Sequence, residues 1–319
     1  MKALVYLGPK ELELQDMEIP KDDVVIKVKE SGICGTDLKT FLKGHPMFKP
    51  PVILGHECYG EVVGMTSDIP GITLGDLVAV APYIECGKCE MCKRGVPELC
   101  KNKTYVETGC FAEYISMSRE HACKALKKIP SDSSVFTLIE PLACVLNGFE
   151  KIGHCSNILV VGGGPMGALF AITAQDKGIN VSVVETSDWR RKYLQSQKIE
   201  LCDKCEEMKF DAIVMAVNKP ELVNEYLENV ENGGVLLLFS GYPSKSTLNV
   251  DPYSIHYREV GLFGCFGFAG KHFNEAKVLI ERNPKNYERL ITHQFSFAEA
   301  KKAFSLLNHA QAMKIILRS

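Results

Sequence analysis

The sequence has no long uninterrupted apolar run, no excess of one charge and no internal repeat. Its most apolar stretch, 158–174, is broken by Gly162-Gly163-Gly164-Pro165 and is shorter than the about 20 residues that a membrane-spanning helix needs. Lys and Arg number 37 and Asp and Glu number 39, which gives a net charge of −2. Because polyanions attract proteins with a large positive excess, we expect neither nucleic acid nor a membrane as a partner.

A secretory signal is also lacking, because residues 1–14 alternate apolar and polar positions and carry no apolar signal core. We therefore expect a cytoplasmic protein. Its 13 cysteines are an odd number, and a reducing compartment keeps thiols free. Metal binding, rather than a set of disulfides, is the expected role of the clustered cysteines. Cys202 and Cys205 are expected to lie in a loop between sheet elements, without a redox role.

Two halves with different patterns follow one another along the 319 residues. Up to about residue 129, short β-forming runs alternate with turns rich in Gly and Pro, which predicts an all-β half that starts with a strand over 1–14. From 133 a helical spacing begins, and apolar runs then alternate with amphipathic segments, which predicts a doubly wound α/β half. Its expected strands lie at 158–161, 181–184, 212–217, 235–239 and 261–263. The segment 273–308 predicts two helices, followed by a final strand at 313–317.

Four cysteines stand close together in a loop that also holds two glycines: Cys86, Cys89, Cys92 and Cys100. Four thiolates at such spacings can close a tetrahedron around zinc and leave no open position. A bacterial iron–sulfur run has a last gap of three residues followed by proline, whereas here the last gap is seven residues and Lys101 follows. The motif therefore predicts a structural zinc site in a lobe at 86–100.

A second set of potential metal ligands lies outside this lobe. Cys34 precedes the pair His56 and Glu57 by 22 residues, and Glu140 opens the first helix of the α/β half. Cys, His and carboxylate groups suit zinc, and three protein ligands leave one position open for a substrate. A zinc deaminase would carry His-x-Glu and a later Pro-Cys-x-x-Cys, a pattern that this sequence does not have. The set predicts a catalytic zinc.

A glycine-rich turn follows the expected strand at 158–161. Gly162, Gly164 and Gly167 form Gly-x-Gly-x-x-Gly, and Pro165 and Met166 begin the next helix. In such a turn the first glycine allows the chain to reverse, the second lets the backbone approach a pyrophosphate, and the third lets the helix pack on the sheet.

Glu185 ends the following strand, 18 residues after Gly167. A carboxylate at this place can hold both ribose hydroxyls of an adenosine and would repel a 2′-phosphate. We therefore expect NAD as the cofactor rather than NADP. Arg190 and Arg191 would favour NADP if they reached the ribose, but they are expected to face solvent.

In this order, the motifs resemble those of the zinc-containing medium-chain alcohol dehydrogenases, most closely the polyol (sorbitol), threonine and butanediol dehydrogenase branch. The similarity covers nearly the whole chain and includes Gly55-His56-Glu57, Phe111-Ala112-Glu113-Tyr114 and Glu140-Pro141-Leu142. The resemblance implies a GroES-like β-barrel catalytic domain at 1–132 and 271–319 and an inserted Rossmann NAD-binding domain at 133–270. It also implies a homodimer or homotetramer.

The resemblance further implies roles for single residues. The catalytic zinc is held by Cys34 and His56, with either Glu57 or Glu140 as the third ligand. Each chain would then carry two zinc ions, one catalytic and one structural.

A carboxylate that orients the ligand histidine is implied at Asp37. Thr36 is placed to pass a proton outward. Lys39 stands where relatives often carry a histidine at the end of the proton relay.

The resemblance implies an enzyme that reversibly oxidises a secondary alcohol, such as a polyol, polyol phosphate or diol, to a ketone by hydride transfer to NAD. Zinc would act as a Lewis acid on the oxygen of this small-molecule substrate. One alternative is oxidation of an amino alcohol, as in threonine 3-dehydrogenases. Another is a non-catalytic protein that binds its partner through the zinc lobe. A third, a zinc-free NADPH quinone reductase on the same scaffold, would lack Cys34, His56 and the cysteine lobe.

Overall fold

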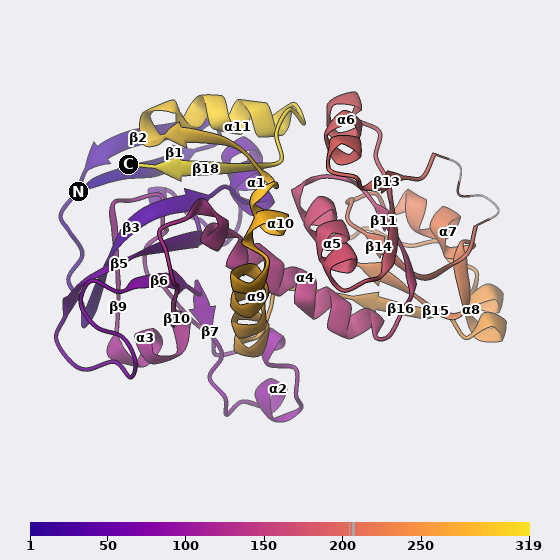
Figure 1. The fold of residues 1–319 in the computed structure, drawn as a ribbon, viewed down its shortest axis with the longest axis horizontal. Coiled ribbons are helices and arrows are strands. Elements are labelled where there is room, and N and C mark those ends of the chain that lie inside the picture. The colour runs from indigo at the N-terminus through magenta and orange to yellow at the C-terminus, as the bar shows by residue number, and fades with distance from the viewer. Residues whose placement is uncertain (204, 206–207) are drawn as a thin grey trace. The chain divides into compact units, whose positions relative to one another are not determined.

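The computed structural model of the chain describes residues 1–203, 205 and 208–319 (Figure 1). They divide into two units, Met1–Ala143 with Phe268–Ser319 and Cys144–Gly267. The sequence-based boundaries, after 132 and after 270, lie eleven residues before and three residues after these divisions. Helix α4 (Ile139–Ile152) crosses the first division. The change of sequence pattern near residue 133 therefore marks the approach to this helix rather than the division itself.

The first unit is built mainly of β-strands. Its strands are β1 (Lys2–Gly8), β2 (Glu11–Asp16), β3 (Val24–Gly32), β4 (Val52–Ile53), β5 (Glu57–Met65), β6 (Leu77–Val80), β7 (Tyr83–Ile84), β8 (Thr104–Tyr105), β9 (Tyr114–Met117), β10 (Leu126–Lys128), β17 (Ile291–Ser296) and β18 (Lys314–Arg318). They form sheets in the orders β2-β1-β4, β10-β6-β5-β3-β18-β17 with β9 also paired to β3, and β7-β8. Strand β3 shows why these residues form a sheet, because Val24, Ile26 and Val28 alternate into the core while Lys27 points out.

Helical segments connect and cover these strands. They are α1 (Gly35–Lys43), α2 (Glu90–Lys93), η1 (Pro97–Leu99), α3 (Arg119–Ala125), η2 (Ser134–Leu138), α9 (Gly270–Arg282), α10 (Pro284–Glu288), η3 (Phe297–Glu299) and α11 (Ala300–Asn308). The carboxyl-terminal segment completes the core of this unit. Phe304 of α11 lies 4.8 Å from Phe41 of α1 and 6.5 Å from Phe111, measured between ring centroids.

Two sequence-based expectations for this unit are wrong. Residues 1–14 form a hairpin of β1 and β2 and not a single strand, because Lys10 adopts a positive φ of 66° between them. The carboxyl-terminal segment contains an additional strand, β17, which pairs in parallel with β18. Strand β18 also pairs with β3, so the end of the chain extends the sheet that contains β3, β5 and β6.

The second unit is a doubly wound α/β sheet. Its strands are β11 (Asn157–Val161), β12 (Asn180–Val184), β13 (Glu200–Leu201), β14 (Phe210–Met215), β15 (Val230–Leu238) and β16 (Gly261–Gly264). All neighbouring pairs are parallel, in the order β13-β12-β11-β14-β15-β16. This order is that of the Rossmann fold. Each of the five expected strands is present, and only the two-residue β13 was missed.

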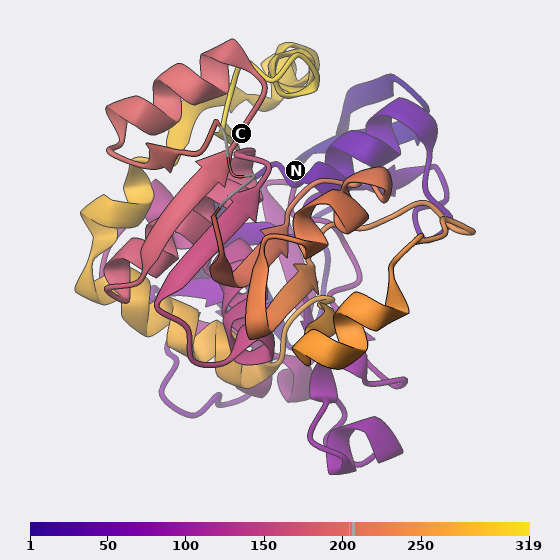
Figure 2. The same ribbon diagram turned by 90° about the vertical axis from the view of Figure 1, so that its right-hand side faces the viewer.

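Helices cover both faces of this sheet, as Figures 1 and 2 show. The helices are α5 (Pro165–Asp176), α6 (Asp188–Ser196), α7 (Glu221–Leu227), α8 (Pro252–Arg258) and the later part of α4. On one face Phe149 of α4 stacks on Phe170 of α5 at 4.3 Å between ring centroids. On the other face Val223 and Leu227 of α7 join a core that includes Leu159 of β11. Such double coverage explains why the central strands are continuously apolar.

A disulfide joins Cys202 and Cys205. The sequence analysis did not predict this bond, although the pair does lie in a loop between sheet elements, after β13. Spacing alone cannot distinguish two free thiols three residues apart from a bonded pair, because the outcome depends on how the loop turns.

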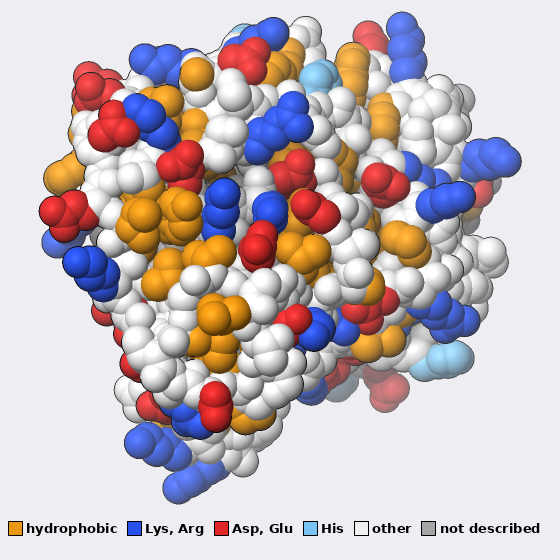
Figure 3. All heavy atoms as spheres, turned by 60° about the vertical axis from the view of Figure 1, so that its left-hand side comes forward, with side chains coloured by type: hydrophobic (Ala, Val, Ile, Leu, Met, Phe, Trp, Pro, Cys, Tyr) orange, Lys and Arg blue, Asp and Glu red, His pale blue; other side chains and the backbone are white. Residues whose placement is uncertain are grey.

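Acidic and basic side chains are interspersed on the molecular face drawn in Figure 3, with hydrophobic side chains between them. This mixture agrees with the small net charge of the chain. Among the described residues, every helix is too short or too polar to cross a bilayer.

Candidate metal centres and phosphate-binding turn

Strands β3 and β5 bring the second set of candidate metal ligands together. Gly32, the last residue of β3, is paired with Glu57, the first residue of β5. Cys34 lies two residues beyond Gly32 and caps the amino end of α1, while His56 directly precedes Glu57. One potential ligand atom from each of Cys34, His56 and Glu57 lies within 4.8 Å of the others.

Asp37 connects the two segments that carry these ligands. Its side chain is fully buried. One carboxylate oxygen accepts a hydrogen bond from the backbone N–H of Cys34 at 2.9 Å, and the other accepts one from Gly55 at 3.3 Å and lies 3.6 Å from His56 Nδ1. The carboxylate therefore stands where it can fix the orientation of the imidazole ring.

Acidic groups surround the histidine of this set. Burial lowers the pKa of His56, but the Asp37 carboxylate and the Cys34 thiol outweigh it and hold that pKa well above its usual value. The pKa of Glu140 is raised to about 7, chiefly by burial, with His56 opposing the rise and Glu57 contributing to it. A cluster that stabilises positive charge on its histidine attracts a cation, and its Cys, His and carboxylate donors are those that zinc prefers.

Lys314 is a member of this cluster that the sequence analysis missed. It is the first residue of β18, and its Nζ lies 2.8 and 2.6 Å from the two carboxylate oxygens of Glu57. Both side chains are buried, with exposed fractions of 2% and 0%. A lysine directly before the apolar residues Ile315, Ile316 and Leu317 of the closing strand was the available signal, because buried lysines are rare unless they are paired.

Glu140, Thr36 and Lys39 are the other residues that the sequence analysis expected at the catalytic site. Glu140 opens α4 and is 8% exposed, but it does not belong to the group whose ligand atoms lie within 4.8 Å of one another. Thr36 is half-buried in the first turn of α1, where its backbone N–H donates to Cys34 Sγ at 3.5 Å. Lys39 is exposed on the same helix.

The four-cysteine lobe gathers all of its thiols: Cys86, Cys89, Cys92 and Cys100. The sulfur of Cys89 lies 3.6 Å from that of Cys92 and 3.7 Å from that of Cys100. In a tetrahedron with Zn–S bonds of about 2.3 Å, sulfur atoms are separated by about 3.8 Å. Backbone N–H groups of Cys92 and Lys101 lower the pKa of Cys89 to about 6. The arrangement fits a closed tetrathiolate zinc site.

The glycine turn joins β11 to α5 in the second unit. Gly162 has a φ of 104°, which only glycine adopts readily, and Gly164 caps the amino end of α5, where Pro165 is the first residue and Met166 the second. A Cβ on Gly167 would collide with the carbonyl oxygen of Gly162. The turn therefore leaves backbone N–H groups at the start of α5, as a pyrophosphate requires, and the guanidinium of Arg190 lies beside Gly164, where an added Cβ would be 3.3 Å from one of its terminal nitrogens.

Glu185 lies beside this turn. One of its carboxylate oxygens accepts a hydrogen bond from Gly163 N–H at 3.0 Å, and the other accepts from Thr186 and Ser187 at 2.7 and 2.8 Å. These three backbone donors hold the carboxylate at the end of β12, where a ribose would lie on the first strand–helix turn of a Rossmann fold.

Two arginines contact Glu185, so the expectation that they face solvent is wrong. A guanidinium nitrogen of Arg190 lies 3.9 Å from the Glu185 carboxylate, and its side chain is 20% exposed. Within the described residues, the buried Nε of Arg190 has no hydrogen-bond partner. Arg191 donates to the backbone carbonyl of Glu185 at 3.0 Å and pairs with Asp203 at 2.7 Å. Helix α6 turns both side chains back toward the strand end, which its sequence pattern alone did not indicate.

Two family models match the chain. That of the alcohol dehydrogenase GroES-like domain matches residues 20–130, and that of the NAD binding domain of 6-phosphogluconate dehydrogenase matches residues 157–252. The first match contains Cys34, His56 and the cysteine lobe, and the second contains the glycine turn and Glu185.

Known proteins are similar over nearly the full length of the chain. L-threonine 3-dehydrogenase of Pyrococcus horikoshii is 30% identical, with 95% of this chain and 94% of that protein aligned. L-galactonate-5-dehydrogenase of Escherichia coli is 28% identical, with 99% and 98% aligned. A solved structure from Sinorhizobium meliloti, described as a zinc-binding dehydrogenase bound to NADP, has a TM-score of 0.87 and 26% identity and covers 100% of this chain and 99% of its own.

Proposed function

Because the chain belongs to the zinc-dependent medium-chain alcohol dehydrogenase family, we propose that it oxidises a secondary alcohol, such as a polyol, polyol phosphate or diol, reversibly to a ketone with NAD. The observation that carries this proposal is the convergence of Cys34, His56 and Glu57 beside the buried Asp37. Membership in this family of oxidoreductases acting on CH–OH donors argues against a non-catalytic protein that binds through its zinc lobe. The same ligand set argues against a zinc-free quinone reductase.

Cys34, His56 and Glu57 would hold the catalytic zinc, because their ligand atoms already lie within 4.8 Å of one another. Glu140 is the alternative third ligand. The lobe cysteines would hold a second, structural zinc. When bound, zinc supplies a Lewis acid for the alcohol oxygen, and the nicotinamide supplies the acceptor for the hydride.

The protein's own residues orient these ligands. The Asp37 carboxylate lies 3.6 Å from His56 Nδ1, where it can orient the ring, and accepts a hydrogen bond from the backbone N–H of Cys34. Lys314 offsets the charge of Glu57, so that the ligand set is not excessively negative before a metal binds. The chain thus provides position and charge balance for the reaction.

We place the proton path on α1. The hydroxyl of Thr36 would accept the proton that leaves the substrate alcohol and at the same time donate its own proton outward, because Thr36 is half-buried within the first turn beyond Cys34. Lys39, exposed on the same helix, would exchange that proton with solvent.

The dinucleotide would bind at the turn formed by Gly162, Gly164 and Gly167, with the pyrophosphate at the start of α5. Glu185 supports NAD, because its carboxylate is held at the strand end by three backbone donors and would repel a 2′-phosphate, whereas Arg190, 3.9 Å from that carboxylate, favours NADP. The unpartnered Nε of Arg190, within the described residues, would donate to an oxygen of the dinucleotide. The Sinorhizobium meliloti protein binds NADP, so the two dinucleotides must be compared directly.

A second candidate reaction is the oxidation of an amino alcohol. The specific observation in its favour is that the threonine 3-dehydrogenases of two Pyrococcus species are each 30% identical to this chain. Sugar-acid and polyol dehydrogenases align over 92–100% of the chain at 26–28% identity, and threonine 3-dehydrogenases align over 95–99% at 26–30%, so the substrate panel described below decides between the two reactions.

We further propose that the chain forms a homodimer or homotetramer in the cytoplasm. Strand β16 is at the edge of the parallel sheet, and Phe263 and Phe266, on and just after it, are 46% and 71% exposed. An unpaired strand edge with exposed aromatics is suited to pair with a second copy. A reducing compartment would keep the metal-binding thiols available.

Zinc content per chain and dinucleotide reduction, measured with polyols, polyol phosphates, diols and threonine, test the function. We expect two zinc ions per chain, turnover with one alcohol class, and a higher kcat/KM with NAD than with NADP. Cys34→Ser should lose one zinc and at least about 10³-fold in turnover while still binding NADH, as followed by fluorescence. The matched control Cys123→Ser, at an exposed cysteine, should change neither. Full turnover by Cys34→Ser, or a single zinc in the parent chain, would contradict the proposal.

A further inference from the structure

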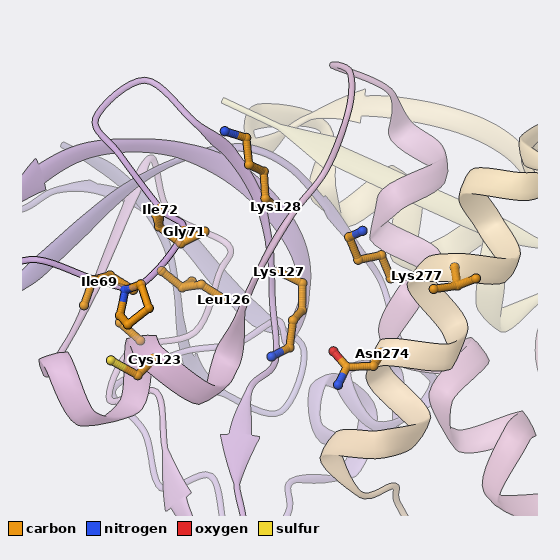
Figure 4. Close-up of a pocket in the computed structure, with 12 residues that line it drawn as sticks. Ile69, Gly71, Ile72, Cys123, Leu126, Lys127, Lys128, Asn274 and Lys277 are labelled. Atoms are coloured by element: carbon orange, nitrogen blue, oxygen red, sulfur yellow. The ribbon is translucent and has the colours of Figure 1, made fainter.

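A cavity of about 450 Å³ opens in the first unit, between the end of α3, strand β10 and helix α9. Its lining includes Lys127, Lys128, Asn274 and Lys277, together with apolar side chains such as Ile72 and Leu126. None of the candidate metal ligands lines it, so the cavity is separate from both zinc sites. Figure 4 shows that Asn274 extends from α9 toward the strand that carries Lys127.

The described lining is basic and contains no Asp or Glu. Two of its lysines already have partners outside the lining: Lys128 binds Asp76 at 2.7 Å, and Lys277 binds Glu281 at 2.8 Å. Lys127 differs from them, because among the described residues no hydrogen bond or ion pair reaches its ammonium group. It is half-buried, and Lys277 is close enough to repel its charge.

The acidic group that does act on Lys127 from a distance is engaged elsewhere. Glu85 attracts Lys127, but its carboxylate accepts a hydrogen bond from the backbone N–H of Gly270 at 3.2 Å, at the amino end of α9. A half-buried ammonium without a direct partner, next to a second ammonium, is an unfavourable arrangement that an anion would relieve. The Asn274 amide offers a further hydrogen-bond donor on the opposite wall.

The remaining wall determines what kind of anion fits. Val278 lines the cavity and is 58% exposed, so it contributes apolar surface there, whereas Ile72 and Leu126 are nearly buried, at 8% and 4%. An inorganic ion would leave this surface in contact with water, whereas an organic anion would cover it. We propose that the cavity binds a small organic phosphate or carboxylate, with its oxyanion group between Lys127, Lys277 and Asn274 and its apolar part against Val278.

Titration calorimetry of the zinc-loaded protein tests this site, with phenyl phosphate and benzoate as the organic anions. Inorganic phosphate is the control compound without an apolar part, and benzyl alcohol is the control compound without a charge. We expect saturable binding of phenyl phosphate or benzoate at millimolar concentration or below, at least about tenfold weaker binding of inorganic phosphate, and no binding of benzyl alcohol at this site. The two organic probes distinguish a phosphate ligand from a carboxylate ligand.

Lys127→Gln should weaken binding of the organic anions at least about tenfold, because it removes the ammonium group and keeps a side chain of similar length. Lys124→Gln is the matched control, since Lys124 is exposed on α3, pairs with Glu120 and does not line the cavity. Equal affinities in the parent protein and Lys127→Gln, equal loss in Lys124→Gln, or no saturable binding of either organic anion would overturn the proposal. Because the readout is binding, it is independent of whether the alcohol reaction proposed above is correct.

Discussion

At the residue scale, the buried ion pair of Lys314 and Glu57 sets the charge of the proposed catalytic site. Their atoms approach to 2.6 Å with exposed fractions of 2% and 0%, so neither charge is hydrated. Lys314 Nζ also contacts the carbonyl oxygen of Ile33, one residue before Cys34. The lysine therefore fixes both the carboxylate ligand and the chain that leads to the cysteine ligand.

Lys314→Met should lower the free energy of unfolding of the zinc-depleted protein by about 3 kcal/mol, because it leaves the Glu57 carboxylate buried without its partner. Loading zinc should reduce this loss, since the metal would then compensate the same carboxylate. Urea unfolding followed by circular dichroism, with and without a chelator, measures both values. Lys124→Met, at an exposed pair, should stay within about 0.5 kcal/mol of the parent protein. The same loss with and without zinc would argue that Glu57 is not a ligand.

At the element scale, the lobe from 86 to 100 has little apolar material to hold its fold. Helix α2 is four residues long and η1 three residues, and α2 has no buried residue. The sulfur atoms of its four cysteines lie within 4.8 Å of one another. The structure of the lobe therefore depends on what those sulfurs bind.

Cys92→Ser should remove one zinc per chain and make the lobe accessible to protease, while the catalytic zinc is retained. The hydroxyl of serine is a poor replacement for a thiolate ligand, and three sulfurs leave the tetrahedron open. Metal analysis and limited proteolysis between 86 and 100 measure the two effects. A variant that keeps two zinc ions and a protected lobe would show that the cysteines do not form a metal site.

Elements whose chemistry depends on local spacing could be predicted from the sequence. The lobe cysteines lie within fifteen residues, and the glycine turn within six, so the chain itself holds their members near one another. The strand and helix flanking the turn follow from the same local pattern, which is why β11, α5 and the fold of the second unit were expected correctly.

Contacts between distant segments could not be predicted in this way. Lys314 and Glu57 are 257 residues apart and meet because β18 and β5 both pair with β3. Strand β17 was missed for the same reason, since its partner β18 follows only after α11. The orientation of Arg190 depends on the angle of α6 to the strand end, which residue spacing does not determine.

At the scale of the whole molecule, the two units differ in how the chain builds them. The second unit is one continuous segment, Cys144–Gly267, whereas the first needs residues from both ends of the chain. In the first unit's core, Phe41 and Phe111 pack against Phe304, and β18 pairs with β3 in an antiparallel arrangement. The first unit should therefore be unable to fold before its carboxyl-terminal segment is present.

A fragment of residues 139–267, which retains all of α4, should fold alone and bind NADH, because its parallel sheet and the core of buried side chains under α7 come entirely from within it. A fragment of residues 1–143 should remain largely unfolded, since its core loses every aromatic and aliphatic side chain that α11 and β18 contribute. Co-expression of residues 268–319 with the 1–143 fragment is the matched control and should restore β-structure by supplying α11 and β18 in a separate chain. Circular dichroism and NADH fluorescence distinguish these outcomes. A folded 1–143 fragment would mean that strand β3 does not need β18, and an unfolded 139–267 fragment would mean that the Rossmann sheet depends on the first unit for its stability.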